Sequence, residues 1–357
     1  MPAVASHQPP PRAKRQTPRR LVGVSVAVAV MVVLLAEVAV RIAQPALATP
    51  SAWPTPELEN KYDQMSARAA SHQTTDAVLV GDSMMDAGGD PDGLAAARGD
   101  SRIYNASVAG ETLPTIVQWT TRVVVPRLHP RVVVIGLSSN ELNPASLAPS
   151  SGIAAYQHSR AARAAEGLGD PVDRADAFLR RWSMLYRYRN ELRSPMHQRP
   201  SPEAAQFDPK LSSNGQDLAF SGSRYLEPGG VKHARLVDAG VTAALKGFTV
   251  SNRNVAVLTK MITTLRAHAI EVVLIAMPVT ADLVSFHPAG AADYQWAMSS
   301  FMSIAASSDA VFAEPGVWPT SEFADPVHLN GSGTARFSAY LAPLLRRVVD
   351  THSRAGK

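Results

Sequence analysis

The sequence predicts an α/β fold, a three-layer α/β/α sandwich with a central, mainly parallel sheet. Three observations indicate this fold. The expected strands at residues 77–80, 131–137 and 271–276 each contain a continuous apolar run, which is typical of strands that are buried on both faces. Segments with helical spacing of apolar residues alternate with these runs, as in a sheet covered by helices. Polar residues follow the runs, where ligands of open parallel sheets bind.

Composition narrows the classes of function. The chain has 357 residues, enough for one large domain or two small ones, and no cysteine, which excludes disulfides and thiolate nucleophiles. The formal charge is +5, and residues 1–20 carry five basic side chains and no acidic one. The charge therefore belongs to a basic tail, and we expect no nucleic-acid partner. No cluster of His, Asp and Glu has metal-ligand spacing, so we expect no metal and no cofactor.

The first elements predict a membrane anchor. Residues 21–40 contain a single charged residue, Glu37. A helix of that length spans about 30 Å, the thickness of a bilayer core. We therefore expect a transmembrane helix over residues 21–42, after a cytoplasmic basic tail at 1–20. The basic tail orients the N-terminus toward the cytoplasm and the remaining chain outside it.

A cleaved signal peptide is the alternative. The residues Ala46-Leu47-Ala48 fit a small-residue cleavage site. The apolar run is longer than a usual signal core, and Arg41 separates it from that site. These features favour an uncleaved anchor. Residues 43–74 then form a linker and a lead-in helix, and the Pro-rich stretch at 44–56 is expected to be a short spacer.

The main domain is expected at residues 75–350. Its first strand, 77–80, ends in Gly81-Asp82-Ser83, where glycine permits a sharp turn that exposes the serine. A second strand is expected at 102–105, followed by a helix that Thr112 caps. The third strand, 131–137, ends in another polar turn, Ser138-Ser139-Asn140-Glu141.

An insertion at residues 145–250 interrupts this alternation. Residues 176–193 predict one amphipathic helix with a basic face, and 194–232 predict a long loop. The alternation then resumes with a helix at 255–265, a strand at 271–276, a helix at 291–306, a short strand at 310–312 and a last helix that begins near Gly331.

Three side chains suggest nucleophilic catalysis. A serine hydroxyl needs a base to become a nucleophile. A polar loop ahead of the last helix carries Asp325 and His328, three residues apart. Ser83 lies at a strand's carboxyl end, and the other two precede the last helix.

The motifs resemble those of the SGNH hydrolases, also called the GDSL family of esterases and lipases. Gly81-Asp82-Ser83 matches the first block, and the resemblance implies Ser83 as nucleophile. Residues 105–110 match the second block, which implies the Gly110 amide as an oxyanion donor. Residues 136–141 match the third, which implies Asn140 as a further donor beside the Ser83 amide. Asp325-Pro326-Val327-His328 matches the last block. The resemblance implies His328 as the base that activates Ser83, and Asp325 as the partner that would fix its tautomer and stabilise its cation.

The third block departs from the family pattern Gly-x-Asn-Asp. Ser138 replaces its glycine and Glu141 its aspartate, although Asn140 is retained. The resemblance covers about residues 75–350 and implies a serine esterase with an acyl-serine intermediate. With the anchor, it predicts a membrane-bound extracytoplasmic enzyme that acts on an ester-bearing envelope glycan or lipid.

Two alternatives remain open from the sequence. An O-acyltransferase would use the same triad with a sugar hydroxyl in place of water. A catalytically silent binding module is the other, suggested by the altered third block. His233 and His287 lie in loops without a partner pattern and are expected at the surface. Asn105-Ala106-Ser107 also fits a glycosylation sequon, but we expect these residues to serve the turn instead.

Overall fold

The computed structural model describes residues 19–46, 52–98, 102–144, 151–189, 192, 210–222 and 240–355. The chain forms two compact units. The first draws on residues 1–50 and 177–199, and the second on residues 51–176 and 200–357. The basic tail expected at 1–20 lies almost entirely outside the described residues.

The second unit is built on a five-stranded sheet. All neighbouring strands are parallel, in the order β2-β1-β3-β4-β5. The strands are β1 (Ala77–Gly81), β2 (Ile103–Asn105), β3 (Val132–Leu137), β4 (Glu271–Ala276) and β5 (Val311–Ala313). Every residue of the first three strands is buried. The predicted parallel sheet of doubly buried strands is therefore confirmed.

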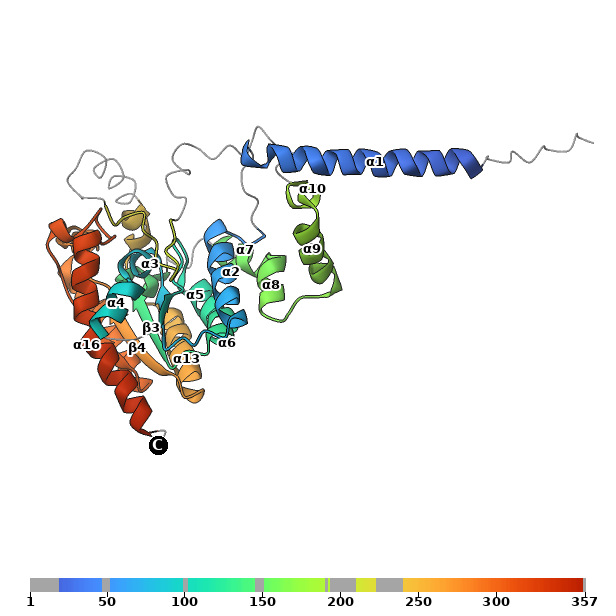
Figure 1. Ribbon diagram of the computed structural model, residues 1–357. Helices are drawn as coiled ribbons and strands as arrows, with labels where there is room; N and C mark the ends of the chain where they lie inside the picture. The colour runs from blue at the N-terminus through green and yellow to red at the C-terminus, as the bar shows by residue number, and fades with distance from the viewer. Residues whose placement is uncertain are drawn as a thin grey trace, which may run out of the picture. The chain divides into compact units, whose positions relative to one another are not determined.

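Helices cover both faces of the sheet and confirm the predicted three-layer sandwich. One layer contains α3 (Ser83–Gly88), α4 (Pro91–Arg98) and α16 (Gly331–Ala355). The other contains α5 (Leu113–Trp119), α13 (Asn252–Ala267) and α15 (Ala291–Ser307). Figure 1 shows α4 and α16 on one side of β3 and β4, and α5 and α13 on the other. Short elements complete the unit: η3 (Ser139–Leu142), α14 (Ala281–Ser285) and η6 (Thr320–Glu322).

The helix expected after Thr112 has an irregular middle. A π-helical turn at Thr120–Val124 follows α5, and α6 (Val125–Leu128) continues from it. The helix ends at His129, whose φ of 45° is left-handed.

The lead-in helix belongs to the same compact unit as the sheet. It is α2 (Pro56–Ala70), and the Thr55 hydroxyl caps it by accepting the Leu58 amide at 3.3 Å. Trp53 is buried, and its ring centroid lies 4.8 Å from that of Tyr62 and 5.5 Å from that of Trp119. The expectation of a simple spacer at 44–56 is therefore wrong for residues 52–56. Trp53 buries a large apolar surface there, as core residues do.

The insertion is largely helical where it is described. It contains α7 (Ser151–His158), α8 (Arg160–Ala165), α9 (Pro171–Trp182) and α10 (Met184–Arg187). The prediction of a single helix at 176–193 is wrong, because α9 ends at Trp182 and a separate helix begins after Ser183. The Ser183 hydroxyl accepts the Tyr186 amide at 3.1 Å and starts a new helix.

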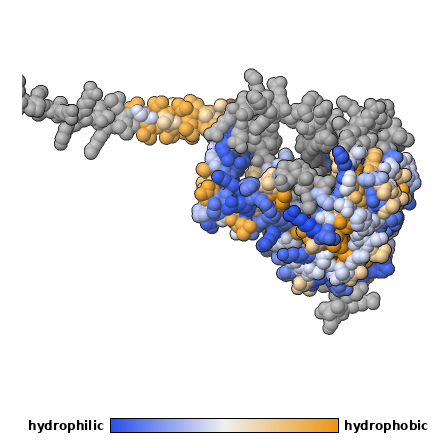
Figure 2. All heavy atoms as spheres, turned by 180° about the vertical axis from the view of Figure 1, so that it is seen from behind, coloured by the Kyte–Doolittle hydropathy of each residue, from blue (hydrophilic) through white to orange (hydrophobic). Residues whose placement is uncertain are grey.

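The first unit is built on α1 (Arg19–Ala43), which continues into η1 (Gln44–Ala46). Residues Gly23–Ala43 have a mean hydropathy of 2.5 and are long and apolar enough to cross a membrane. Most of their described side chains are exposed, and Figure 2 shows the surface of this helix as mostly hydrophobic. A soluble core helix would bury such side chains.

Candidate active site

Ser83 lies at the start of a helix directly after strand β1, which lies between β2 and β3 in the sheet. The Asp82 side chain caps this helix by accepting the Met84 amide at 2.9 Å. Ser83 itself remains partly exposed, whereas the five residues that follow it are buried. This placement at the carboxyl end of a parallel strand is where ligands bind in such sheets.

Two glycines let α3 sit closely against the sheet. Gly81 of β1 pairs in register with Gly136 of β3. A Cβ atom on Gly81 would overlap the Gly136 carbonyl oxygen, and one on Gly136 would overlap the end of the Met85 side chain. Both positions therefore require close backbone approach, a role in which glycine is favoured.

His328 and Asp325 form a buried pair. The His328 Nδ1 atom lies 2.7 Å from the Asp325 Oδ2 atom. The other Asp325 oxygen accepts the backbone amides of Val327 at 2.9 Å and His328 at 2.8 Å, which fixes the carboxylate. Burial disfavours the imidazolium, but the charge and hydrogen bond of Asp325 outweigh burial and raise the pKa of His328. A base next to a fixed carboxylate is the arrangement that general-base catalysis requires.

The residues 210–222 supply an aromatic contact to this pair. The Phe220 ring stacks on the His328 ring, with centroids 4.2 Å apart and planes 9° apart. His328 also interacts electrostatically with Asp82, the neighbour of Ser83. Among the described residues, no hydrogen bond joins the Ser83 hydroxyl to His328. Hydrogen bonds of this kind are often long before substrate binds.

The three expected oxyanion donors line one pocket. Ser83, Gly110 and Asn140 face a cavity of about 350 Å³, together with Thr112 and small residues at 240–244. Gly110 has a φ of 72°, so its conformation favours glycine, and there is open space where a Cβ would be. Asp325 and His328 do not line this cavity.

The two departures from the third-block pattern hold Asn140 at both ends of its amide. The Asn140 Nδ2 atom donates to Glu141 Oε1 at 2.8 Å, and the Ser138 hydroxyl contacts Asn140 Oδ1. Glu141 Oε2 in turn accepts the Ser138 amide at 2.8 Å and its hydroxyl at 3.0 Å. Ser138 and Glu141 therefore act as a matched pair that orients the amide.

Glu141 also couples the third block to the first. Burial raises the pKa of Glu141 well above its usual range, and the nearby charge of Asp82 raises it further. Asp82 is buried as well, and a side-chain hydrogen bond links it to Glu141. Burial raises the pKa of Asp82 as well, so ionisation of both carboxyls at once is disfavoured in this low-dielectric surrounding.

A buried lysine cluster lies behind the site and was not expected from the sequence. The Lys61 ammonium of α2 contacts the Asp86 carboxylate of α3 and the Ser107 carbonyl, and it lies 3.3 Å from Glu57 Oε1. Glu57 Oε2 accepts the Ala109 amide at 3.1 Å. Lys61 thus joins the helix that carries Ser83 to the loop that carries the Gly110 amide. The i,i+4 spacing of Glu57 and Lys61 was the sequence signal, but such pairs are common on exposed helices.

Asn105 makes a second link between these segments. Its Nδ2 atom lies within 3.1 Å of the carbonyls of Met85, Asp86 and Gly89, and its Oδ1 accepts the Ser107 amide at 3.0 Å. Asn105 is fully buried, in keeping with a structural role for this sequon.

His287 corrects an expectation. Only 3% of its surface is exposed, and its Nε2 atom lies 2.8 Å from the Ser139 hydroxyl. Burial lowers the pKa of His287, so the ring is held neutral beside the Asn140 turn. The loop assignment concealed this role because α14 and Phe248 enclose the ring only in three dimensions. His233 lies outside the described residues.

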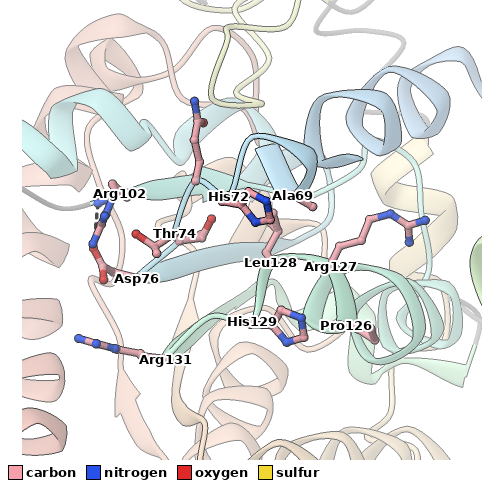
Figure 3. A pocket seen from close by; sticks show the side chains of 12 residues that line it. Ala69, His72, Thr74, Asp76, Arg102, Pro126, Arg127, Leu128, His129 and Arg131 are labelled. Carbon is pink, nitrogen blue, oxygen red and sulfur yellow. Dashed lines mark hydrogen bonds and ion pairs between the residues drawn. The ribbon is translucent and has the colours of Figure 1, made fainter. Parts of the chain in front are cut away.

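A larger hollow occurs at the opposite ends of the strands. It measures about 810 Å³ and includes Asp76, Arg102, Arg127 and Arg131. Figure 3 shows Arg127 and Arg131 pointing away from each other and Arg102 paired with Asp76. No expected catalytic residue lines it. Anywhere in the described part of the chain, this hollow included, no group of three or more His, Asp or Glu side chains could hold a metal.

Comparisons with known proteins return structural similarities only. No family model and no curated protein match the chain. A Bacteroides fragilis protein assigned as an acylhydrolase is 10% identical, with 80% of this chain and 96% of that chain covered and a TM-score of 0.40. A lipase/acylhydrolase from Enterococcus faecalis is 12% identical, with 76% and 96% covered and a TM-score of 0.37. A carbohydrate acetylesterase family member from Sinorhizobium meliloti is 13% identical, with 77% and 100% covered and a TM-score of 0.34.

The names of these three proteins describe enzymes that hydrolyse acyl esters, or members of a family of such enzymes. At TM-scores of 0.40 and below the likeness does not assign an activity to this chain. The functional argument therefore rests on the geometry of the site.

Proposed function

We propose that the protein is an SGNH-type serine esterase that forms an acyl-enzyme on Ser83. The observation that carries this proposal is the fixed Asp325–His328 pair at 2.7 Å, in the same compact unit as a pocket lined by Ser83, Gly110 and Asn140. A raised pKa for His328 favours the imidazolium that a proton-accepting base must become.

The reaction follows from the roles of these groups. His328 takes the Ser83 hydroxyl proton as the oxygen attacks the ester carbonyl. The resulting oxyanion is stabilised by the amides of Ser83 and Gly110 and by the Asn140 side chain. His328 then gives its proton to the leaving alcohol, and water releases the acyl group by the same steps in reverse order. Asp325 orients the imidazole throughout.

The pocket favours a short acyl group. Among the residues that the structure describes, its lining contains Gly240, Ala243 and Ala244, the polar Thr112 and no large apolar side chain. A long alkyl chain gains binding energy only by burying apolar surface, at about 25 cal/mol per Å². We therefore propose an acetyl-sized ester on a cell-envelope glycan rather than a long-chain lipid ester.

The apolar helix α1 supports a further part of the proposal. We propose that it anchors the protein in the cell membrane, with the catalytic unit outside the cytoplasm. The substrate would then be a component of the envelope. A cleaved signal sequence is the alternative, and the size of the N-terminal segment in the mature protein decides between them.

An O-acyltransferase is the second candidate. The stacking of Phe220 on His328 leaves the histidine 8% exposed, and limited access of water favours transfer to a sugar hydroxyl. Product analysis with an acceptor glycan distinguishes the two, since transfer in excess of free acid would exclude simple hydrolysis.

The test uses p-nitrophenyl acetate and a fluorophosphonate probe on the full chain in mild detergent. Turnover should disappear in Ser83→Ala and His328→Ala, and labelling should disappear in Ser83→Ala. Labelling without turnover would indicate a transferase that lacks its acceptor. A folded protein with neither labelling nor turnover would refute catalysis and favour a binding module.

A further inference from the structure

The segment at residues 177–189, within the first unit, presents an unusual surface. It covers the last turns of α9, all of α10 and the two residues after it. The Phe178 and Trp182 side chains are 61% and 64% exposed, and their ring centroids lie 6.2 Å apart. The segment contains four arginines and no acidic residue: Arg180, Arg181, Arg187 and Arg189. We call it the arginine–aromatic segment.

Glu37 of α1 holds this segment directly. Its carboxylate accepts the Met184 amide at 2.8 Å, the Leu185 amide at 2.9 Å and the Ser183 hydroxyl at 2.9 Å. Arg41, one turn further along α1, pairs with the same carboxylate at 3.0 Å. The contact is therefore a charge-assisted cap on the first turn of α10.

The position of Glu37 sets the depth of this contact. A carboxylate within an apolar span is costly unless donors satisfy it, and here the donors come from α10. Glu37 precedes the end of α1 at Ala43 by six residues, about 9 Å along a helix. If α1 spans a bilayer, the amides of Met184 and Leu185 lie near the boundary of the hydrocarbon, and Trp182 is two residues away.

We propose that the arginine–aromatic segment lies in the interfacial layer of the membrane that α1 crosses. Phe178 and Trp182 insert at the level of the head groups, where aromatic rings are favoured. Arg181 and Arg187 contact the phosphates of anionic lipids, to which basic side chains near a membrane surface are attracted. The proposal rests on the anchor proposed above and adds a second membrane contact from the insertion.

A lipid surface explains the exposure better than a protein partner does. Exposed aromatic residues on a soluble protein mark an interaction site of some kind. Here the same segment is tied to a helix whose own apolar side chains are exposed over residues 23–35. The partner that covers that helix is then adjacent to the aromatic pair as well.

The absence of cysteine provides a specific test. In the full-length chain, Leu179→Cys introduces a single thiol at a site that is 41% exposed and leaves Phe178 and Trp182 intact. Met302→Cys on α15, 54% exposed, is the matched control. Both are labelled with an NBD fluorophore in vesicles of phosphatidylcholine and phosphatidylglycerol. We expect a blue shift and quenching by shallow doxyl lipids at position 179 and neither at 302.

A second variant tests the contact with α1. Glu37→Ala, combined with Leu179→Cys, should abolish the doxyl quenching while the protein remains resistant to carbonate extraction. Quenching that persists in Glu37→Ala would refute the role of Glu37. A water-like spectrum at 179 in the otherwise unchanged chain would refute membrane contact, and a blue shift without doxyl quenching would indicate a protein contact and refute it equally.

These outcomes are separable from failure of the proposed esterase. The depth measurement needs no turnover, so an inactive protein with a quenched label still supports the inference. Extraction of the chain by carbonate would show that α1 does not anchor it, and this outcome would overturn both the anchor and the inference while leaving p-nitrophenyl acetate hydrolysis unaffected.

Discussion

The substitution Lys61→Met would test how far the site depends on residues ahead of the first strand. The Lys61 ammonium is fully buried between Glu57 and Asp86, and it contacts the carbonyl of Ser107. Methionine has a similar length but no charge, so the variant would leave the neighbouring carboxyls without their cation. Breaking a buried pair in this way typically costs about 3–5 kcal/mol.

The same change should impair catalysis. Burial, strengthened by the charge of Glu57, already raises the pKa of Asp86 well above its usual range, and Lys61 opposes this shift. Without Lys61, the helix of Ser83 and the loop of Gly110 lose their common support. A displacement of about 1 Å can reduce a rate about 100-fold. We expect kcat to fall by about that factor, with a smaller change in KM.

The assay combines denaturant unfolding with steady-state hydrolysis of p-nitrophenyl acetate, both in the same detergent. Lys260→Met, on the exposed face of α13, is the matched control and should change the unfolding free energy by less than about 0.5 kcal/mol. The double variant Lys61→Met with Glu57→Gln removes one cation and one anion and should recover part of the stability. A Lys61→Met protein with unaltered stability and kcat would refute the reasoning.

Four further predictions concern the site itself. Because the pKa of His328 is raised, kcat/KM should increase with pH through a value above 6.5, the ordinary pKa of histidine. Asp325→Asn should lower that pKa and should reduce kcat by about 10⁴-fold. The pH profiles of the native protein and of the variant test both expectations. Asn140→Ala should lower kcat about 10²–10³-fold with little change in KM, and an unchanged kcat would exclude it as a donor. Burial raises the pKa of Glu141, so stability is lost as pH rises from the ordinary pKa of a glutamate through the raised pKa in the fold. Glu141→Gln should therefore gain stability relative to the native protein above the raised pKa and not below the ordinary one, and unfolding measured as a function of pH tests this. Gly110→Ala should lower the free energy of unfolding by about 1–2 kcal/mol, because alanine is strained at the positive φ of this residue. Denaturant unfolding measures this change, and a variant as stable as the native protein would contradict the positive φ.

The sheet could be predicted well from the sequence because its longest fully buried strands contain no polar residue that would obscure the pattern. The runs at 77–81 and 132–137 are apolar at every position, since helices cover both faces. Short-range signals also located the Asp325–His328 pair, because the two residues are only three apart. Relations across the chain were less accessible. Nothing in the local pattern of residues 57–61 distinguishes a buried ion pair from an exposed one, and the break at Ser183 depends on a cap whose partner, Glu37, lies 146 residues away.

The same limit explains the errors. His287 has no partner nearby in sequence, and its hydrogen bond to Ser139 spans 148 residues. Trp53 lies among the four prolines of residues 44–56, a context typical of a linker, yet its ring packs against aromatic side chains of three separate helices. Tertiary packing, rather than local preference, decided both cases.

The paired glycines under α3 have an evolutionary consequence. A side chain at Gly81 would meet backbone, the Gly136 carbonyl, which no neighbouring substitution can remove. A side chain at Gly136 would first meet the flexible end of Met85 and then the Met277 sulfur. Changes at Gly81 should therefore disrupt the packing of β1 against β3 in every background. Changes at Gly136 are conditional, and smaller residues at 85 and 277 could open a mutational path that is closed in the present sequence.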